Sequence, residues 1–454
     1  MLQRRLGLFQ STVLNMIDMV GIGPFITLPI VVGYIGGMYI YAWIAGAVLS
    51  FVDAMIWSEL GAAYPLAGGS FHFLNEAYGK DKLGKMMGFL YVWQTIIQAP
   101  LVAASAAIGF ATYFLYLVPD LSIWQQKCIS ASVIIIVTFL LYRKIENIGK
   151  IGVLLWMGVL ATLLWIITGG ITHGNLFLTV KEMPHFFSLN ILFSFSFGQA
   201  CVKSIYSYLG YYNVCHLGAE IKKPEKNIPR SMFISIAGIM LLYLFMNISV
   251  TSVIPWQEIK SWQDGGINNF VVSIFIERLY GKTAATAATI MILWVAIASL
   301  FAVLLGYSRV PYAAALNGSF FRFFAKLHPT KNFPYVSLLI LSFLAFVFSM
   351  LFRMGEVISA ILAMRIIVQF IGQAIGVVLL RKRNGKENLT YRMPFYPMPV
   401  ILAIIMWLLI FIATGLAIIK TFFLVLGSGV IVYFIKARFS REWPFTKNVN
   451  SNQM

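Results

Sequence analysis

Among the ionisable side chains inside long apolar stretches of the chain, three are candidates for coupling or gating. They are Asp18, Lys203 and Arg365, and each is well removed from the nearest polar segment. In such surroundings a charged group is costly, and it usually lines a water-filled path, pairs with another charge or handles a proton. Asp18 is the candidate for carrying or gating a proton, because the protonation of a carboxyl group held out of water depends on its surroundings.

The two basic side chains allow two interpretations. Lys203 lies about one turn before a weak point in its apolar stretch, and Arg365 lies near the middle of its own. Both could face an outer vestibule, where they would attract an anionic group or pair with carboxylates in a gate. Alternatively, Lys203 extends to the outer membrane interface and Arg365 binds backbone carbonyl groups. Asp53, also in an apolar stretch, would pair with a neighbouring helix.

Two of the apolar stretches contain short segments that disfavour a continuous helix. Residues 21–25 read Gly-Ile-Gly-Pro-Phe, in which glycine weakens a helix and Pro24 lacks an N–H. Proline suits the first turn of a new helix, so we expect one half-helix to end near Gly21 and another to begin at Pro24. In the second segment, residues 207–213, Gly210 stands among tyrosines.

An interrupted helix inside a membrane leaves backbone N–H and C=O groups that lipid cannot satisfy. Such groups are tolerated where they line a cavity or bind a ligand. The N-terminus of a half-helix attracts carboxylates and the C-terminus attracts cations, so a zwitterionic amino acid would satisfy both. Paired breaks in the two halves of a chain indicate a transporter binding site near the bilayer midplane. The alternative is two simple kinks, which are common in membrane helices.

The elements that carry these residues must be membrane helices. Apolar residues make up 60% of the 454 residues, charged residues make up 11% and the mean hydropathy is +0.83. A soluble domain carries about 25% charged residues. A helix crosses the bilayer with about 20 apolar residues, and the long uninterrupted apolar runs exclude a β-barrel. Twelve spans are predicted, at 8–34, 38–63, 84–117, 122–142, 149–170, 187–217, 232–254, 280–316, 334–352, 356–380, 397–418 and 420–437.

Basic residues are distributed unevenly between the two sides that these spans define. If the N-terminus is cytoplasmic, 25 of the 34 Lys and Arg residues fall in inner segments and seven in outer ones. Positive residues favour the cytoplasmic side, so we expect a multi-pass protein of the cell membrane with both termini in the cytoplasm. The net charge of +18 then reflects topology and attraction to anionic membrane lipid, and no nucleic-acid partner is expected.

Blocks of sequence in the right order resemble the amino acid–polyamine–organocation (APC) superfamily of permeases, over about the first 400 residues. The blocks are Gly21 to Phe25 with Pro29; Ser58-Glu59-Leu60-Gly61, Tyr64-Pro65 and Gly68-Gly69-Ser70-Phe71; Gly218-Ala219-Glu220, Lys223-Pro224 and Asn227-Ile228-Pro229-Arg230; and Gly306-Tyr307-Ser308-Arg309-Val310-Pro311-Tyr312. Any one block alone would be a weak signal, whereas the ordered set is specific.

The resemblance implies an all-α membrane fold of 12 transmembrane helices, a LeuT-like five-plus-five inverted repeat followed by two helices. The repeats would be 1–175 and 176–392, with the last two helices and a cytoplasmic tail in 393–454. The substrate's carboxylate would bind amides of the first break, and its amino group would bind carbonyls of both breaks. The implied contacts are Gly21, Ile22, Gly23, Ser207, Tyr208, Leu209 and Gly210, and the aromatic residues Phe25, Tyr206, Tyr208 and Tyr211 flank the breaks, where they would cover a substrate or simply pack.

Departures from the family pattern affect the expected substrate. Ile22 replaces a serine hydroxyl and Pro24 removes one amide, which leaves fewer donors for a carboxylate. The Gly-Pro-Phe sequence also resembles the polyamine-carrying branch, which places acidic residues where this chain has Ile26, Thr27 and Tyr212. Because no carboxylates stand there, we expect an amino acid, with a polyamine or another organic amine as the alternative.

The expected function is secondary active transport by alternating access, either proton-coupled or by exchange. No enzyme is expected, because the histidines show no zinc spacing and no nucleophile motif or phosphate loop occurs. Neither a metal nor a cofactor is expected, and the three cysteines form no paired framework. A substrate sensor on the same fold stays open, as does the oligomeric state. Glu59, Glu220 and Arg309, at cytoplasmic helix ends, are candidates for gating salt bridges.

Overall fold

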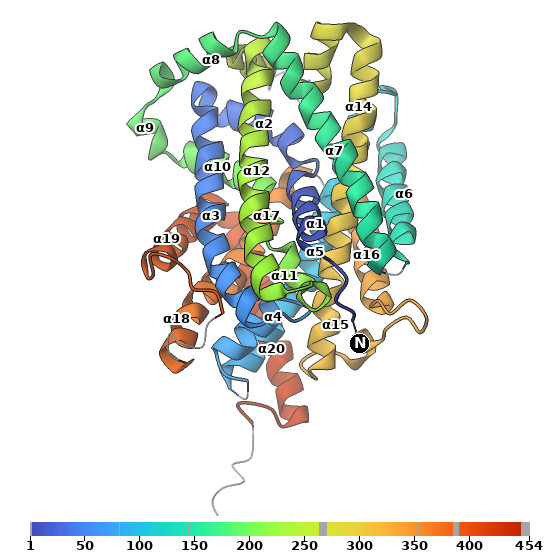
Figure 1. Cartoon of the computed structure of the whole chain (residues 1–454), viewed down its shortest axis with the longest axis vertical. Helices are drawn as coiled ribbons and strands as arrows, with labels where there is room; N and C mark the ends of the chain where they lie inside the picture. Colours follow the sequence, from blue (N-terminus) through green and yellow to red (C-terminus); the bar gives the residue numbers. More distant parts are fainter. Residues whose placement is uncertain are drawn as a thin grey trace, which may run out of the picture.

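The computed structural model describes residues 2–80, 82–143, 145–262, 270–352, 354–384 and 390–445. In these ranges the regular structure is helical, apart from isolated β-bridges that join residue 6 to 221 and residue 67 to 217. The helices run mainly along the long axis of the molecule and pack into one bundle (Figure 1). The bundle therefore satisfies its backbone polar groups within helices, as a membrane requires.

The long helices carry the apolar stretches seen in the sequence. Eight helical runs among the described residues are long and apolar enough to cross a membrane, and two shorter apolar helices accompany them. The chain is therefore a multi-pass helical membrane protein, while the count of twelve spans stays a prediction. The long helices are α3 (Tyr39–Ala63), α5 (Leu83–Phe114), α6 (Ile123–Leu141), α7 (Ile145–His173), α12 (Pro224–Val253), α14 (Val271–Tyr307) and α20 (Leu416–Ser440). The two shorter apolar helices are α16 (Tyr335–Leu351) and α19 (Met398–Ala413).

Shorter helices connect the long ones. The bounds of these helices are α4 (Ser70–Ala77), α8 (Leu176–Glu182), α9 (Leu189–Leu192), α13 (Trp256–Ser261) and α15 (Arg309–Leu316). Single turns of 3₁₀-helix at Gly36–Met38, Met183–Phe186, Gly218–Glu220 and Arg322–Ala325 complete the connections.

The first interrupted helix occurs as predicted. α1 (Leu8–Val20) ends before Gly21, whose φ of +41° favours glycine, and α2 (Gly23–Ile35) begins after Ile22. Pro24 stands in the first turn of α2, where a helix makes no use of an N–H. The second half-helix thus begins one residue earlier than predicted.

The second interruption lies between α10 (Phe195–Tyr208) and α11 (Asn213–His216). Leu209 has extended backbone angles, and Gly210 has a φ of +120°, a value that side chains rarely tolerate. The chain therefore leaves the helical path at Leu209, and the glycine noted in the sequence follows directly with a positive φ.

A third irregularity was not predicted. The tenth predicted span consists of α17 (Met354–Arg365), a π-helical segment (Ile366–Ile371) and α18 (Gly372–Asn384). The π-helical residues contain neither glycine nor proline, so composition gives no sign of the widened turn. Such turns often occur at functional sites, and this one directly follows Arg365.

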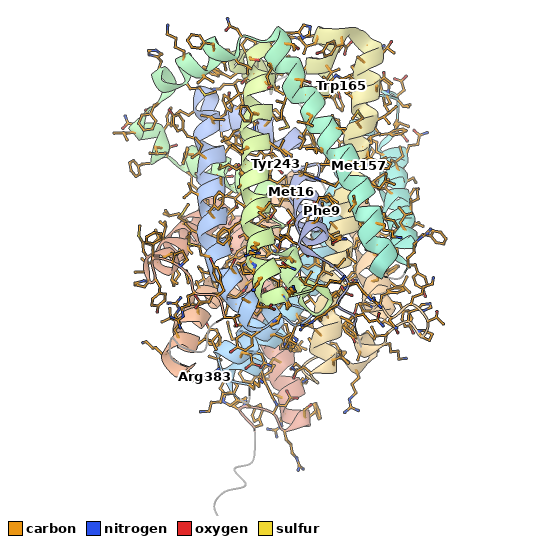
Figure 2. All side chains as sticks on the ribbon, in the orientation of Figure 1. Phe9, Met16, Met157, Trp165, Tyr243 and Arg383 are labelled. Carbon is orange, nitrogen blue, oxygen red and sulfur yellow. The ribbon has the colours of Figure 1, made fainter. Side chains whose placement is uncertain are left out.

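The interrupted helices lie at the centre of the bundle, and apolar side chains cover its outside. α10 packs against α2 and α3, and α1 packs against α12 and α7. On the outside, Phe139 of α6 and Leu424 of α20 are both 74% exposed. Phe9 and Met157, labelled in Figure 2, are 62% and 56% exposed. Lipid contact explains why so many large apolar side chains face outward.

The N-terminal segment and the last turn of α20 lie toward the same end of the bundle (Figure 1). α18 and its residue Arg383 lie at this end as well (Figure 2). The two ends of the described chain therefore share one side of the molecule, and which side faces the cytoplasm stays a prediction. Four basic residues that contributed to that prediction, Lys144, Arg353, Lys386 and Lys447, lie outside the described residues.

Candidate functional site

A small buried cavity lies where the two interrupted helices meet. Its volume is about 40 Å³. A cavity needs about 10–15 Å³ by this measure to hold one water molecule, so this cavity holds a few waters and must widen to take an amino acid. The lining residues are Asp18, Met19, Gly21, Ile22, Gly23, Val102, Ser105, Ala106, Tyr206, Ser207, Leu209, Gly210, Tyr212, Ser299, Tyr307, Ile361 and Arg365.

Helix ends give the cavity a positive side and a negative side. α2 begins at Gly23, beside Ile22, and the N–H groups of a first helical turn have no partner within the helix. α10 ends at Tyr208, and its last C=O groups carry partial negative charge beside Leu209 and Gly210. One space thus offers donors to a carboxylate and acceptors to an ammonium group.

Glycines allow the interrupted helices to approach one another closely. A Cβ atom on Gly210 would lie 2.8 Å from backbone atoms of Asp18. A Cβ atom on Gly21 would lie 2.8 Å from the Oγ of Ser299. A side chain at Gly210 would push the second break away from α1, and one at Gly21 would push the first break away from α14. The two glycines therefore let the backbone of both breaks reach the cavity wall.

Tyr243 of α12 connects the two breaks. Its hydroxyl lies 2.8 Å from the carbonyl oxygen of Met19 in α1 and 2.9 Å from that of Ser207 in α10. A hydroxyl has one proton, so it donates to one of these carbonyls at a time. Next to this junction the hydroxyls of Thr27 and Ser207 are 2.9 Å apart. Tyr243 lies in the upper half of the bundle as drawn in Figure 2.

Asp18 and Arg365 line the cavity from α1 and α17. Arg365 donates through Nη2 to Oε1 of Gln98 at 2.9 Å and to the hydroxyl of Tyr307. Its guanidinium carbon lies 5.3 Å from the ring centroid of Tyr212. These partners are side chains, not the backbone carbonyls of the alternative interpretation. Asp18 and Arg365 attract each other, yet no hydrogen bond or direct ion pair joins them in the part of the chain that the structure describes.

Lys203 lies outside the cavity. Its side chain is buried, with a residue exposure of 6%, and its Nζ is 3.1 Å from the Oγ of Ser359 in α17. The ammonium group therefore ties α10 to α17 and does not extend to the membrane interface. Its predicted role in gating stays a prediction.

The aromatic residues beside the breaks have different surroundings. Tyr206 lines the cavity, and its hydroxyl is 2.8 Å from the Oγ of Ser105 in α5. Phe25 is fully buried and meets Tyr113 edge to face, with ring centroids 6.5 Å apart. Phe25 therefore packs the first turn of α2 against α5, on the side away from the cavity.

Tyr208 and Tyr211 also pack behind the cavity wall. Tyr208 meets the ring of Trp43 at a centroid distance of 6.1 Å. Tyr211 donates a hydrogen bond to Asp53, and Trp407 Nε1 donates to the same carboxylate at 3.2 Å. The expected pairing of Asp53 with a neighbouring helix is thus present, and it anchors the second break to α3 and α19.

Two buried ion pairs lie toward the end of the bundle that holds the N-terminus. Arg309 Nη2 is 3.1 Å from Oε1 of Glu220, and the two side chains are 3% and 1% exposed. Arg381 pairs with Glu59 in the same manner, at 10% and 2% exposure. The three residues proposed for gating salt bridges therefore all have charged partners in this state.

The N-terminal segment closes over the first of these pairs. The N–H groups of Arg5 and Leu6 donate to the carbonyl of Glu220 at 2.9 Å, and the N–H of Lys222 donates to the carbonyl of Leu6 at 2.8 Å. The segment before α1 is thus fixed to the loop after α11, and both elements must move together or separate.

Among the described residues, no group of three or more His, Cys, Asp or Glu side chains could hold a metal ion. His216 instead packs in the core, with its ring centroid 4.8 Å from that of Tyr307 and its Nε2 3.3 Å from the hydroxyl of Tyr91. The polar groups that line the cavity itself, among them Asp18, Ser207 and Arg365, offer hydrogen bonds and charge attraction.

Residues of other helices complete the cavity and were not predicted from the sequence. Ser105 comes from α5, Ser299 and Tyr307 from α14, and Ile361 from α17. Tyr307 stood in a recognised block of sequence without a role. These residues lie in regular helices, so only the packing of the bundle reveals that they reach the site.

The chain is similar to known membrane transport proteins over most of its length. A sequence profile of the family described as amino acid permease matches residues 6–435. The serine/threonine exchanger SteT of Bacillus subtilis is 27% identical over 413 positions, which cover 89% of each chain. The branched-chain amino acid permease BcaP of that organism is 22% identical and covers 96% of this chain and 94% of its own. Its methylthioribose transporter is 22% identical with the same coverage. All three are transporters, with different cargoes.

Proposed function

The chain belongs to the amino acid permease family, and on this premise we propose that it carries amino acids across the cell membrane as a secondary transporter. Its family and relatives are transporters rather than enzymes. The observation that carries the proposal is the cavity between the two helix breaks, with N–H groups of α2 on one side and C=O groups of α10 on the other. A zwitterion matches both sides.

In the proposed complex the carboxylate of the amino acid accepts hydrogen bonds from the N–H groups of Ile22 and Gly23. Its ammonium group donates to carbonyls at the end of α10, close to Ser207 and Leu209. Gly21 and Gly210 permit this approach, and Tyr206 covers the site from the side of α5. Phe25, Tyr208 and Tyr211 hold the broken helices in shape without touching the substrate.

We further propose that access to the site alternates between the two sides of the membrane. The cavity of about 40 Å³ is too small for an amino acid, so substrate entry must widen it. On the side of the termini, we propose that the Glu220–Arg309 pair and the N-terminal segment attached to it close the exit from the cavity. These contacts must separate before the substrate can be released on that side. We take that side to be the cytoplasm, because the predicted segments on it hold most of the Lys and Arg residues.

The proposed architecture has twelve spans in two inverted repeats, 1–175 and 176–392, followed by 393–454. Each repeat then begins with an interrupted helix, which places the two breaks side by side. For energy coupling we propose either proton symport or exchange, with Asp18 as the residue that carries or gates the proton and with Arg365 and Lys203 as gating residues.

The test is uptake by purified protein in liposomes, with a radiolabelled panel of amino acids and polyamines. We expect accumulation of amino acids that depends on a proton gradient or on amino acid inside the liposomes. Uptake of polyamines in place of amino acids would establish the organic-amine alternative. Binding without flux under every gradient would identify a sensor and contradict the transport proposal.

A further inference from the structure

We propose that Asp18 and Arg365 form a split ion couple that selects amino acids whose neutral side chains both donate and accept a hydrogen bond. Carboxamides, as in asparagine and glutamine, fit such a couple best, and the hydroxyls of serine and threonine come next. The inference rests on the proposed transport function and adds the class of side chain to it. Its basis is one carboxylate and one guanidinium, on different helices, in one cavity.

The couple lies beside the space left for the side chain of a substrate. Asp18 precedes Gly21 by less than one turn, toward the end of the bundle that holds the N-terminus. Arg365 lies 5.3 Å from the ring centroid of Tyr212, which follows the second break toward that same end. The ends of α2 and α10 already match the α-carboxylate and α-ammonium groups. The two charged side chains are therefore left for the remainder of the substrate.

Arg365 is held in place by groups that do not cancel its charge. Gln98 and Tyr307 are neutral hydrogen-bond partners, and the ring centroid of Tyr307 lies 4.9 Å from the guanidinium carbon. Among the described residues, the buried Nε of Arg365 has no hydrogen-bond partner. A guanidinium has five N–H donors, so this one retains the capacity to bind an acceptor oxygen.

Asp18 offers the complementary half of the couple. Its carboxylate lines the cavity and accepts no hydrogen bond from the part of the chain that the structure describes. The backbone at Gly210 lies directly against it, since a Cβ atom there would be 2.9 Å from Asp18 Cγ. A carboxylate is purely an acceptor, so it is satisfied by a donor that enters from the cavity.

The cancellation of the two charges decides which side chain fits. The phenols of Tyr206, Tyr212 and Tyr307 line the same cavity, and a phenol ordinarily carries no charge at physiological pH. An acidic side chain would be attracted by Arg365 and repelled by Asp18, and a basic side chain would be attracted by Asp18 and repelled by Arg365. Neither charge therefore gains a large net attraction from the couple. A carboxamide gives its oxygen to the guanidinium and its NH₂ to the carboxylate. An aliphatic side chain would leave both groups without partners.

The test compares three amino acids of similar size, asparagine, aspartate and leucine, as competitors of uptake into liposomes. For the wild-type protein we expect asparagine to compete about tenfold more strongly than either of the others, because hydrogen bonds to charged groups contribute on the order of 1.5–3 kcal/mol. In Asp18→Asn the guanidinium of Arg365 loses its counter-charge. We therefore expect aspartate to gain about tenfold in competition relative to asparagine.

For Arg365→Gln, 2,4-diaminobutyrate is added as a basic competitor of similar size. Without Arg365 the charge of Asp18 is no longer cancelled, so we expect 2,4-diaminobutyrate to gain about tenfold in competition relative to asparagine. Arg365→Lys, which keeps the charge, should keep the wild-type order. Because each result is a ratio between competitors in one preparation, it does not depend on the yield of folded protein.

Glu258→Gln is the control, since it removes a carboxylate that pairs with Arg278, lies outside the cavity and holds neither helix break. We expect it to leave the order of competitors unchanged. Unchanged order in both Asp18→Asn and Arg365→Gln would overturn the ion couple while leaving amino acid transport intact. Failure of the wild-type protein to transport any amino acid would instead contradict the proposed function.

Discussion

At the scale of single residues, one hydroxyl group holds the two breaks together. Tyr243 lies within hydrogen-bond distance of the carbonyls of Met19 and Ser207. In Tyr243→Phe both of these buried acceptors lose that donor, which costs about 1–3 kcal/mol. We expect a lower unfolding temperature and a larger fractional loss of initial uptake rate than of folded protein, measured on the same preparation.

A matched control is available in α20. The hydroxyl of Tyr433 also binds a backbone carbonyl, that of Trp443 at 2.8 Å, far from the cavity along the chain and outside its lining. Tyr433→Phe should therefore lose a comparable hydrogen bond without changing the uptake per folded molecule. Equal losses of uptake in the two variants would contradict a specific role for Tyr243 at the site.

Gly210 sets a second requirement at the residue scale. Its φ of +120° and its contact with Asp18 leave no room for a methyl group. We expect Gly210→Ala to abolish uptake and to destabilise the protein by about 1–3 kcal/mol through backbone strain. Gly427 of α20 is the control, because a Cβ atom there meets nothing within 4 Å. Gly427→Ala lies inside a helix, so it should be neutral or slightly stabilising and should leave uptake unchanged.

At the scale of elements, the N-terminal segment, the loop after α11 and α15 form one closed unit. Removing one partner of a buried ion pair leaves the other charge uncompensated, at a cost of about 3–5 kcal/mol. Glu220→Gln should therefore favour the state in which this unit is open. The native thiol of Cys215, buried in α11, provides the readout.

In a background of Cys128→Ser and Cys201→Ser, we expect Glu220→Gln to make Cys215 react faster with a membrane-impermeant thiol reagent from the side of the termini. Glu442→Gln is the control, because it breaks the partly exposed pair with Lys436 outside this unit. Labelling that stays slow in Glu220→Gln would show that the pair does not restrict access on this side.

The local chemistry of the chain explains which elements were predictable. Gly21, Pro24 and Gly210 break helices through their own backbone properties, so the sequence reveals both interruptions. The π-helical turn at Ile366–Ile371 and the partners of Tyr243 arise from packing between distant segments, for which the sequence offers no local sign. Asp18 and Arg365 were recognisable as charges in apolar surroundings, but their placement in one cavity required the fold.

At the scale of the whole molecule, the helix that carries Asp18 connects the cavity to the closed end of the bundle. α1 begins just after the segment fixed to Glu220 and ends at the first break. A change in charge at Asp18 therefore acts at the substrate and on an element that must move when the unit opens. This position is suited to coupling a proton to transport.

We expect Asp18→Asn to abolish the response of uptake to an imposed pH gradient. In liposomes with wild-type protein, an imposed pH gradient should change the initial uptake rate, because Asp18 is ionised while it pairs with a bound neutral side chain and can take up a proton when the cavity is empty. In the variant the amide cannot bind or release a proton at physiological pH, so uptake should be the same with and without the gradient, while exchange against internal amino acid continues.

Asparagine and aspartate are both assayed as substrates, since the variant is expected to change its preference between them. A full response to the gradient in Asp18→Asn would assign the coupling to another group, and a wild-type protein indifferent to the gradient but dependent on internal amino acid would be an exchanger.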